Sequence, residues 1–497
     1  MIWLILCSQA LAGGAVLEDA RGVALDVATY GDDGPVDRRG AWWADIEDTG
    51  LQKVLQDGLP SNPDLRAAEA RVDLARANTW MSLSALLPSI ALEATTQEAP
   101  TDAMGLNPGA ASIPNYGDAF ASLGTLLADL AAATGADPSN VPDFSGAETS
   151  MPDTFRQSSA MLKGAWTVDV FGRQTMTTMA SHKDARAARS AAHAQHQATT
   201  ALLASAWYNV VAAREQSRVV EEQVQTAQSL LDIVQLRYER GEGSALDVLQ
   251  QRQQLAGTKA LLPRARAGQT AAEGLLSAAM GKQRPAALPA SSGWPDLPSA
   301  PGLGHPRRLV DDRPDVQAAV RSAEATRLRH GAAYSALAPT LTLTGQYGRQ
   351  YLTLDETESV DTWGVGAVAT MPLFAGGRTH AGIRAARAAK QVAAMELQST
   401  VLAAVQQVES AIAGETAASE TLEAVKLQAA AARDALTESK AHYLQGLAPY
   451  VSVLAALAAD QAAQLALLDA HRSRLDARIN LHLALGGQWR VPQESSP

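Results

Sequence analysis

The stretch FAGGRTHAGIRAARAAKQVAA, residues Phe374–Ala394, joins the end of a predicted strand to a long helix rich in alanine and arginine. A second junction of the same kind, FGRQTMTTMASHKDARAARSAAH, occupies residues 171–193. Glycine adopts positive φ without steric cost, so we expect Gly172 in one copy, and Gly376 and Gly377 in the other, to form the strand-to-helix corner. The same corner made twice in one chain predicts an internal repeat.

Two fixed offsets support that repeat. An offset of 251 places NPDLRAA, from Asn62, on RPDVQAA, from Arg313. An offset of 205 then holds for over a hundred residues without a gap. It matches Arg173 with Arg378, Tyr238 with Tyr443, Gly241 with Gly446, and Gly281 with Gly486. Chance is a poor explanation for matched proline, glycine and tyrosine residues at fixed offsets, so we interpret the chain as two copies of one unit.

The repeat predicts how the chain is organised. Each unit reads as helix, strand, loop, strand, long helix, tight turn and helix. The expected segments are a signal segment (1–12), an N-terminal periplasmic segment (13–47), a first repeat (48–281) with an insertion (98–159) and a helical hairpin (173–281), a linker (282–311), a second repeat (312–486) with a helical hairpin (378–486), and a tail (487–497).

Four predicted strands lie near residues 89–97, 161–171, 340–348 and 362–374. Apolar and polar side chains alternate along them, which is typical of a strand with one apolar face. We expect Trp166 and Leu343 on that face and Lys163 and Thr342 on the other. A half-buried sheet of a soluble protein is one interpretation, but a length near ten residues also suits a tilted membrane strand. Four strands cannot close a barrel, so a membrane sheet requires two, three or more copies of the chain.

The predicted helices are far longer than those of a globular domain. No proline interrupts residues Thr175–Arg240, and 66 helical residues extend roughly 100 Å. The returning helix, Ser244–Met280, is shorter. We expect the preceding helix, Leu51–Leu86, to stack end to end with it and so match the long partner. Such hairpins bury their apolar stripes only against neighbouring hairpins, which predicts that a β-barrel continues into an α-helical barrel.

Composition narrows the class of protein. The 497 residues carry a formal net charge of −11, which argues against a nucleic-acid partner. No run of eighteen uncharged apolar residues is present, as a membrane-spanning helix would require.

The N-terminal MIWLILCSQALAGG resembles part of an export signal. Its Cys7, the sole cysteine, is an alternative site of lipid attachment, although Leu6 is large where a small residue is usual.

The sequence does not favour an enzyme. His193 and His196 lie one helical turn apart, but no third metal ligand accompanies them, and we interpret them as part of a solvated helix face. The FAGGR stretch lacks the spacing of a phosphate-binding loop. No nucleophile elbow is found. We therefore expect no catalytic residue, no metal site and no cofactor.

At this point the chain resembles the TolC-like outer-membrane efflux proteins, in particular the branch that serves multidrug efflux pumps. The resemblance covers most of the chain, from about Trp42 to Trp489. It is carried by AWWADIEDTGLQKVLQDGLPSNPDLRAAEARVDLARA, LLPSIAL, VDVFGR, RYERGEGSALDVLQ, RPDVQAA, PTLTLTGQYG, PLFAGGR and LHLALGGQW. It implies a mixed α and β membrane protein, a homotrimer with a twelve-stranded barrel in the outer membrane of a Gram-negative cell and a twelve-helix periplasmic tunnel. The implied partners are a periplasmic adaptor, an inner-membrane transporter of the RND, ABC or MFS type, and outer-membrane lipids.

The expected function is a passive exit duct of a tripartite pump for small molecules such as drugs. A duct for type I protein secretion, a metal-ion duct and a structural helical envelope protein without a pore are the alternatives. Two features depart from the family pattern. The insertion at 98–159 is far longer than its counterpart in the second repeat, and the second tip, QGLAPYVSVL, lacks the acidic residue that often follows its glycine.

The turns between long helices are the candidate functional tips. Gly241 and Gly446 each follow a helix that ends in Tyr-x-x-Gly, so they are the expected turn points. The plain interpretation is that they only close hairpins; the resemblance adds that the tips meet the adaptor. We expect the docking groups to be Arg240, Gly241 and Glu242 in one tip and Gly446 and Leu447 in the other. Asp247, opposite Ser452 in the alignment, is the candidate for a ring of carboxylates at the aperture.

Overall fold

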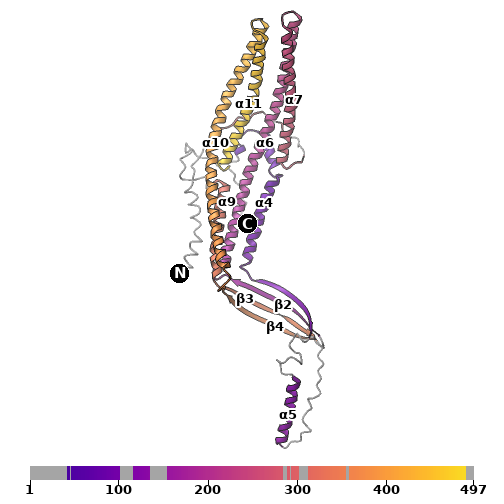
Figure 1. The fold of residues 1–497 in the computed structure, drawn as a ribbon, viewed down its shortest axis with the longest axis vertical. Coiled ribbons are helices and arrows are strands. Elements are labelled where there is room, and N and C mark those ends of the chain that lie inside the picture. The colour runs from indigo at the N-terminus through magenta and orange to yellow at the C-terminus, as the bar shows by residue number, and fades with distance from the viewer. Residues whose placement is uncertain are drawn as a thin grey trace. The chain divides into compact units, whose positions relative to one another are not determined.

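The structure, a computed structural model, describes residues 42–44, 46–100, 116–134, 154–283, 288–290, 293–301, 312–353 and 357–487. Side chains of α5 are described from residue 125 onward. The expectations for the signal segment, Cys7 and most of the two terminal segments fall outside these residues. The chain forms two compact units (Figure 1). One is helical, within residues 1–80, 176–334 and 378–497, and the other contains the sheet, within residues 81–175 and 335–377.

Two long helices dominate the structure. α6 (Arg173–Glu239) and α10 (Arg378–Leu444) each contain 67 residues, and they begin 205 residues apart. The helices that follow them, α7 (Ala245–Ala279) and α11 (Tyr450–Ala484), contain 35 residues each at the same offset. All four helices contribute to one buried apolar cluster near the turns, formed by Ala227, Leu230, Leu231, Val234, Val248, Leu255, Leu436, Tyr443, Tyr450, Val453 and Leu457.

The main core of the helical unit surrounds Trp207 of α6, which is fully buried. Around it pack the short helices η1 (Trp42–Ala44) and α3 (Thr49–Gly58), together with apolar residues of α7 and α11. Asp48 joins these parts, because its Oδ1 accepts from the N–H of Gly50 and its Oδ2 accepts from Trp207 Nε1 at 2.9 Å. Capping of α3 and anchoring of the indole therefore depend on one carboxylate.

The helix expected at Leu51–Leu86 is two helices, α3 and α4 (Pro63–Ser84), so that prediction was wrong. The break follows from Pro60 and Asn62. A proline removes one backbone donor, and Asn62 Oδ1 caps the next helix by accepting from Asp64 N at 2.9 Å. The amide of Asn62 also donates to Ala279 O at 2.8 Å, so the start of α4 meets the end of α7 as expected for end-to-end stacking.

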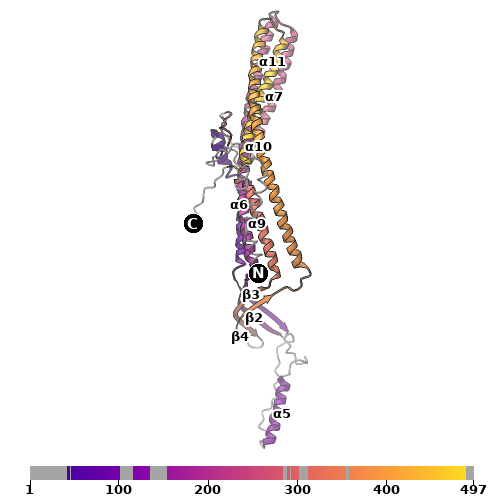
Figure 2. The same cartoon turned by 90° about the vertical axis from the view of Figure 1, so that its left-hand side faces the viewer.

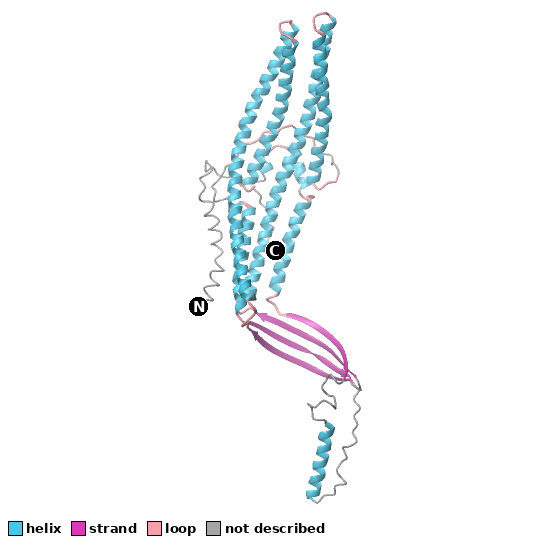
Figure 3. Cartoon of the chain, in the orientation of Figure 1, coloured by secondary structure: helices cyan, strands magenta, loops and turns pink. Residues whose placement is uncertain are grey.

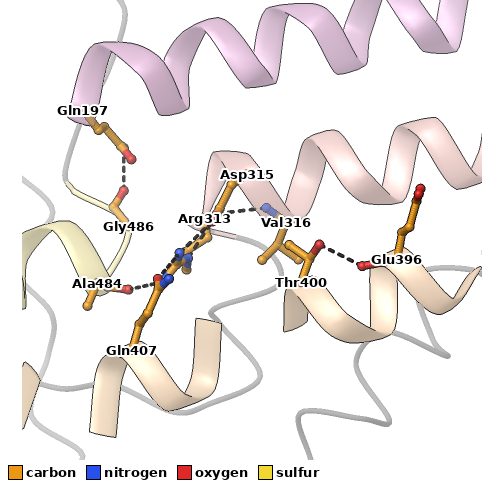
Figure 4. Close-up of polar contacts among 9 residues, drawn as sticks. All are labelled: Gln197, Arg313, Asp315, Val316, Glu396, Thr400, Gln407, Ala484 and Gly486. Atoms are coloured by element: carbon orange, nitrogen blue, oxygen red, sulfur yellow. Dashed lines mark hydrogen bonds and ion pairs between the residues drawn. The ribbon is translucent and has the colours of Figure 1, made fainter. Parts of the chain in front are cut away.

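A second junction of this kind involves Arg313, 251 residues after Asn62. Arg313 precedes α9 (Pro314–Tyr334) and donates to Ala484 O, at the end of α11, at 3.0 Å (Figure 4). The same guanidinium also contacts Asp315 and Gln407. The two junctions thus use different side chains for the same purpose: each satisfies a carbonyl at a helix end that has no partner within its own helix.

α9 lies between the two long helices (Figure 2). Its Val316 and Val320 share a buried cluster with Leu397 and Val401 of α10. On the other side its Ala325 and Leu328 pack against Ala180 of α6. Small residues allow these helix axes to approach closely, which explains the alanine-rich composition of the chain.

Four antiparallel strands form one sheet in the order β1-β2-β3-β4 (Figure 3). They are β1 (Ser89–Pro100), β2 (Thr154–Val168), β3 (Thr340–Thr353) and β4 (Thr357–Thr370), and a short helix, η4 (Ser335–Leu337), precedes β3. All four strands run further than expected at one end. At the other end β2 and β4 finish early, because Asp169 turns to cap α6 and Pro372 has no N–H for the ladder. β1 and β4 are the edges of the sheet.

Two helices bear on the expectation that the chain has no membrane-spanning helix. α5 (Tyr116–Thr134) occupies the insertion between β1 and β2, and its Leu126 and Leu130 are exposed. Within the described residues, α11 is long and apolar enough by composition to cross a membrane. Its Asp460 is buried, however, and Gln461 bonds to Gln223 and Gln254 of the neighbouring hairpin. These polar contacts identify α11 as a partner helix of the hairpins.

Candidate functional site: sheet faces, corners and helical tips

One face of the sheet is apolar across all four strands. Leu92, Leu162, Tyr347 and Trp363 lie directly opposite one another in the register, and all four side chains are exposed, Trp363 by 73%. Trp166 pairs with Leu343 on the same face. A row of exposed aromatic and aliphatic side chains is costly in water, at roughly 25 cal/mol per Å² of apolar surface. This face therefore requires an apolar environment.

The opposite face of the sheet is mostly polar, although Met161 and Val368 also lie on it. Lys163 forms an ion pair with Glu93 at 2.8 Å, and Thr167 lies 3.4 Å from Thr342, hydroxyl to hydroxyl. Lys163 and Thr342 lie on this face, as the alternation predicts.

The apolar face also has a boundary along the strands. From Leu341 to Tyr347 the apolar positions of β3 span about 20 Å, and next come the ion pairs Arg349–Asp361 and Arg156–Glu98. A band of this height, ending in charged pairs, resembles the lipid-facing belt of a membrane barrel.

The expected corner glycines adopt the conformation that requires glycine. The φ angles are 67° at Gly172, 58° at Gly376 and 83° at Gly377. In the first corner Asp169 accepts hydrogen bonds from Gln174 N at 3.0 Å and Thr175 N at 2.6 Å. The chain therefore turns and starts the next helix within a few residues.

Both helical tips end in the same glycine motif. Gly241 has φ of 74° and Gly446 has φ of 75°. Each glycine N–H donates to a carbonyl three residues back, and the following N–H, of Glu242 or Leu447, donates five residues back. This pair of hydrogen bonds at each tip defines a Schellman motif. The expected docking groups Arg240, Glu242 and Leu447 are exposed, as are the two glycines.

The sequence analysis missed Arg237, which connects the two hairpins. Its Nη1 donates to Tyr443 O at 2.7 Å and to Leu444 O at 2.8 Å, at the end of α10. Its guanidinium also lies over the Tyr443 ring, 4.8 Å from the centroid. The signal was present, because the offset of 205 places Arg237 on His442, so this position carries a basic residue in both copies.

Asp247 lies beside this contact. Its carboxylate accepts from the N–H of Ser244 at 3.3 Å and completes a capping box at the start of α7. Burial, followed by the charge of Asp247 in the other hairpin, raises the pKa of Tyr443. A second bridge runs from the Tyr450 hydroxyl to Gln251 Oε1 at 2.5 Å. The candidate aperture residue is therefore also part of the contact between the tips.

The histidine pair gives no metal site within the described chain. No group of three or more His, Cys, Asp or Glu side chains converges there. Burial lowers the pKa of both His193 and His196, with positive charge from Arg189 and Arg321 adding to the effect at His193.

The apolar sheet face and the very long helical hairpins indicate a membrane-inserted channel protein with a helical extension. The chain belongs to the outer membrane efflux protein family, whose model matches residues 54–282 and 306–487. The protein is an outer-membrane efflux channel with a periplasmic helical part.

Curated relatives resemble the chain over most of its length. Nodulation protein T of Rhizobium leguminosarum is 24% identical over 92% of this chain and 86% of the relative. The antibiotic efflux pump outer membrane protein ArpC of Pseudomonas putida is 24% identical over 90% of this chain and 85% of the relative. The outer membrane protein OprJ of Pseudomonas aeruginosa is 26% identical over 72% of this chain and 76% of the relative.

Solved structures share the fold. VceC of Vibrio cholerae superposes with a TM-score of 0.74, at 20% identity, over 90% of this chain and 98% of that one. The open state of the MtrE channel of Neisseria gonorrhoeae gives a TM-score of 0.74, at 21% identity, over 93% and 96% of the two chains.

Proposed function

We propose that three copies of the chain close a twelve-stranded barrel and act as the passive exit duct of a tripartite efflux pump. The observation that carries this proposal is the open sheet with an exposed apolar face. Its edges, β1 and β4, are antiparallel to their neighbours within the sheet. β4 of one copy can therefore continue the antiparallel order with β1 of the next, and ring closure satisfies the backbone groups that lipid cannot.

The helical hairpins support the same proposal. α6 and α10 follow β2 and β4 directly, so each strand pair supplies one long helix to the same end of the barrel. α7 with α4, and α11 with α9, meet end to end and complete the length of the long helices. Two hairpins per chain supply the walls of a twelve-helix tunnel in a trimer. The matched lengths and the matched junctions support the interpretation as two tandem repeats.

The exposed tips are the proposed contact with the periplasmic adaptor. Arg240 and Glu242 in one tip and Leu447 in the other offer charged and apolar groups to a helical partner. Gly241 and Gly446 hold these turns, and a side chain at either position would be strained by the positive φ. Asp247 is the proposed aperture carboxylate, and neutralising it should lower the preference of the pore for cations.

The proposed cargo is a small molecule such as a drug, delivered by an inner-membrane transporter. The names of relatives support this choice, since ArpC is described as part of an antibiotic efflux pump.

The test uses a deletion strain that is complemented with the wild-type chain or with the variant Gly241→Trp/Gly446→Trp. Restored resistance to dyes and antibiotics by the wild type alone, with equal trimer levels, is expected. Restored tolerance of divalent metals, or restored polypeptide secretion, without any effect on drugs would contradict the cargo assignment.

A further inference from the structure

A group of basic side chains gathers where α6 and α9 meet. Arg186, Arg189 and His193 lie at spacings of three and four residues, which places them on one face of α6. Arg321 of α9 extends across this face. Its Nη1 donates to Arg186 O at 3.4 Å and to the hydroxyl of Ser190, which is buried.

The carboxylates nearby are already paired. Glu324 forms an ion pair with Lys183 at 2.7 Å, and Asp184 forms one with Arg329. In the part of the chain that the structure describes, no carboxylate lies within ion-pair distance of Arg186 or Arg189, and both are exposed. The face therefore keeps a local excess of positive charge in a chain whose net charge is −11.

The cations in this group are close enough to act on one another. Burial, followed by the charges of Arg189 and Arg321, lowers the pKa of His193. Burial, followed by the charge of Arg186, lowers the pKa of Arg321, although the charge of Glu324 opposes this shift. Mutual repulsion of this kind costs free energy in the empty protein, and a bound anion would offset it.

We propose that Arg186, Arg189, His193 and Arg321 form a binding site for a soluble oxyanion of the phosphate class. Guanidinium groups recognise the oxygens of phosphate through paired N–H donors. Among the described contacts of Arg321, both hydrogen bonds come from Nη1, which leaves Nε and Nη2 to a ligand. The imidazole N–H of His193 adds a donor on the same face of α6.

The position of the site along α6 favours a soluble ligand over a lipid headgroup, an argument that rests on the proposed membrane position of the sheet. α6 begins at Arg173, five residues after β2 ends. At 1.5 Å per residue, Arg186 and His193 lie roughly 20 and 30 Å along the helix. If α6 leaves the membrane as a wall of the proposed helical tunnel, headgroups at the level of the strand ends are beyond the reach of these side chains. The site would therefore take a phosphate-bearing small molecule from the periplasm or from the duct.

Equilibrium dialysis of the full purified chain in detergent against labelled inorganic phosphate, at constant ionic strength, tests the site. The wild type should bind close to one phosphate per chain saturably. Arg186→Gln/Arg189→Gln should weaken binding about tenfold or more, because each lost charged hydrogen bond accounts for about that factor. The matched control Arg218→Gln/Arg266→Gln removes the same charge where each arginine already contacts a glutamate, and should bind like the wild type.

Unsaturable binding by the wild type, or equal binding by the wild type and Arg186→Gln/Arg189→Gln at equal trimer content, would overturn the site. A second arm distinguishes the source of the oxyanion. Protein reconstituted in vesicles of phosphatidylethanolamine with and without phosphatidylglycerol should bind phosphate equally. Loss of phosphate binding only when phosphatidylglycerol is present would assign the site to a lipid headgroup and overturn the soluble ligand.

Discussion

The guanidinium of Arg237 lies 4.8 Å from the ring centroid of Tyr443 and donates a hydrogen bond of 2.7 Å to the carbonyl oxygen of that residue. The arginine belongs to the first hairpin and the tyrosine to the second, so this contact holds the two tips together. Arg237 is mostly buried, with 15% of its side chain exposed, so water screens the contact little.

Arg237→Ala should loosen the tips. Loss of two charged hydrogen bonds and a cation–π contact should weaken the attraction between hairpins by about 2 kcal/mol. We expect single channels in planar bilayers to show longer open times than the wild type. Arg218→Ala, whose partners lie on its own helix, is the control. Unchanged open times in Arg237→Ala would mean that this contact does not restrain the mouth.

The two sheet faces should respond differently to the same substitution. Leu343→Arg places a charge on the apolar face and should cost about 2–4 kcal/mol at the membrane midplane, whereas Thr342→Arg lies on the polar face and should be tolerated. The measurement is the fraction of assembled oligomer in outer-membrane extracts. Equal loss in both variants would refute the assignment of faces.

His482 should make the helical unit less stable in acid. Its ring stacks on Trp42 at 5.2 Å, and burial, then the positive charge of Arg478, lowers its pKa to about 4 despite the nearby Glu415. The unfolded chain therefore binds more protons than the folded chain between about pH 6.5 and 4, and stability falls as the pH falls through that window. The loss should reach about 3 kcal/mol.

Thermal unfolding midpoints of the wild type and His482→Gln, measured at pH 7 and at pH 4.5, test this prediction. The wild type should lose more stability than the variant, since glutamine does not titrate and the acidic groups common to both chains cancel in the difference. An equal loss of stability in the wild type and in His482→Gln would show that His482 does not cause the loss in acid.

The sequence predicted the helices well because their signals are local and long. The expected limits of the long first helix, Thr175–Arg240, differ from α6 (Arg173–Glu239) by at most two residues. Alternation of apolar and polar residues also predicted both faces of the sheet. The break at Pro60 was missed although its signals, Pro60 and the Asn62 cap on Asp64 N, are local. Only the contact of the Asn62 amide with Ala279, which is distant in sequence, could not be predicted from the sequence.

At the tips, too, local features could be predicted from the sequence and contacts between distant residues could not. Gly241 and Gly446 were predicted because positive φ selects glycine locally. Arg237 was missed because the basic position that it shares with His442 does not reveal that its partners are backbone carbonyls at the end of α10. The side-chain contacts between the two hairpins came only from the structure.

The number of chains in the assembled protein tests the central proposal most directly. Native mass spectrometry of the protein extracted from membranes in mild detergent should give a single species of three chain masses. This result is expected because four strands with free edges at β1 and β4 cannot be stable in lipid alone. A monomer that retains its native strand content by circular dichroism would contradict the shared barrel and, with it, the duct.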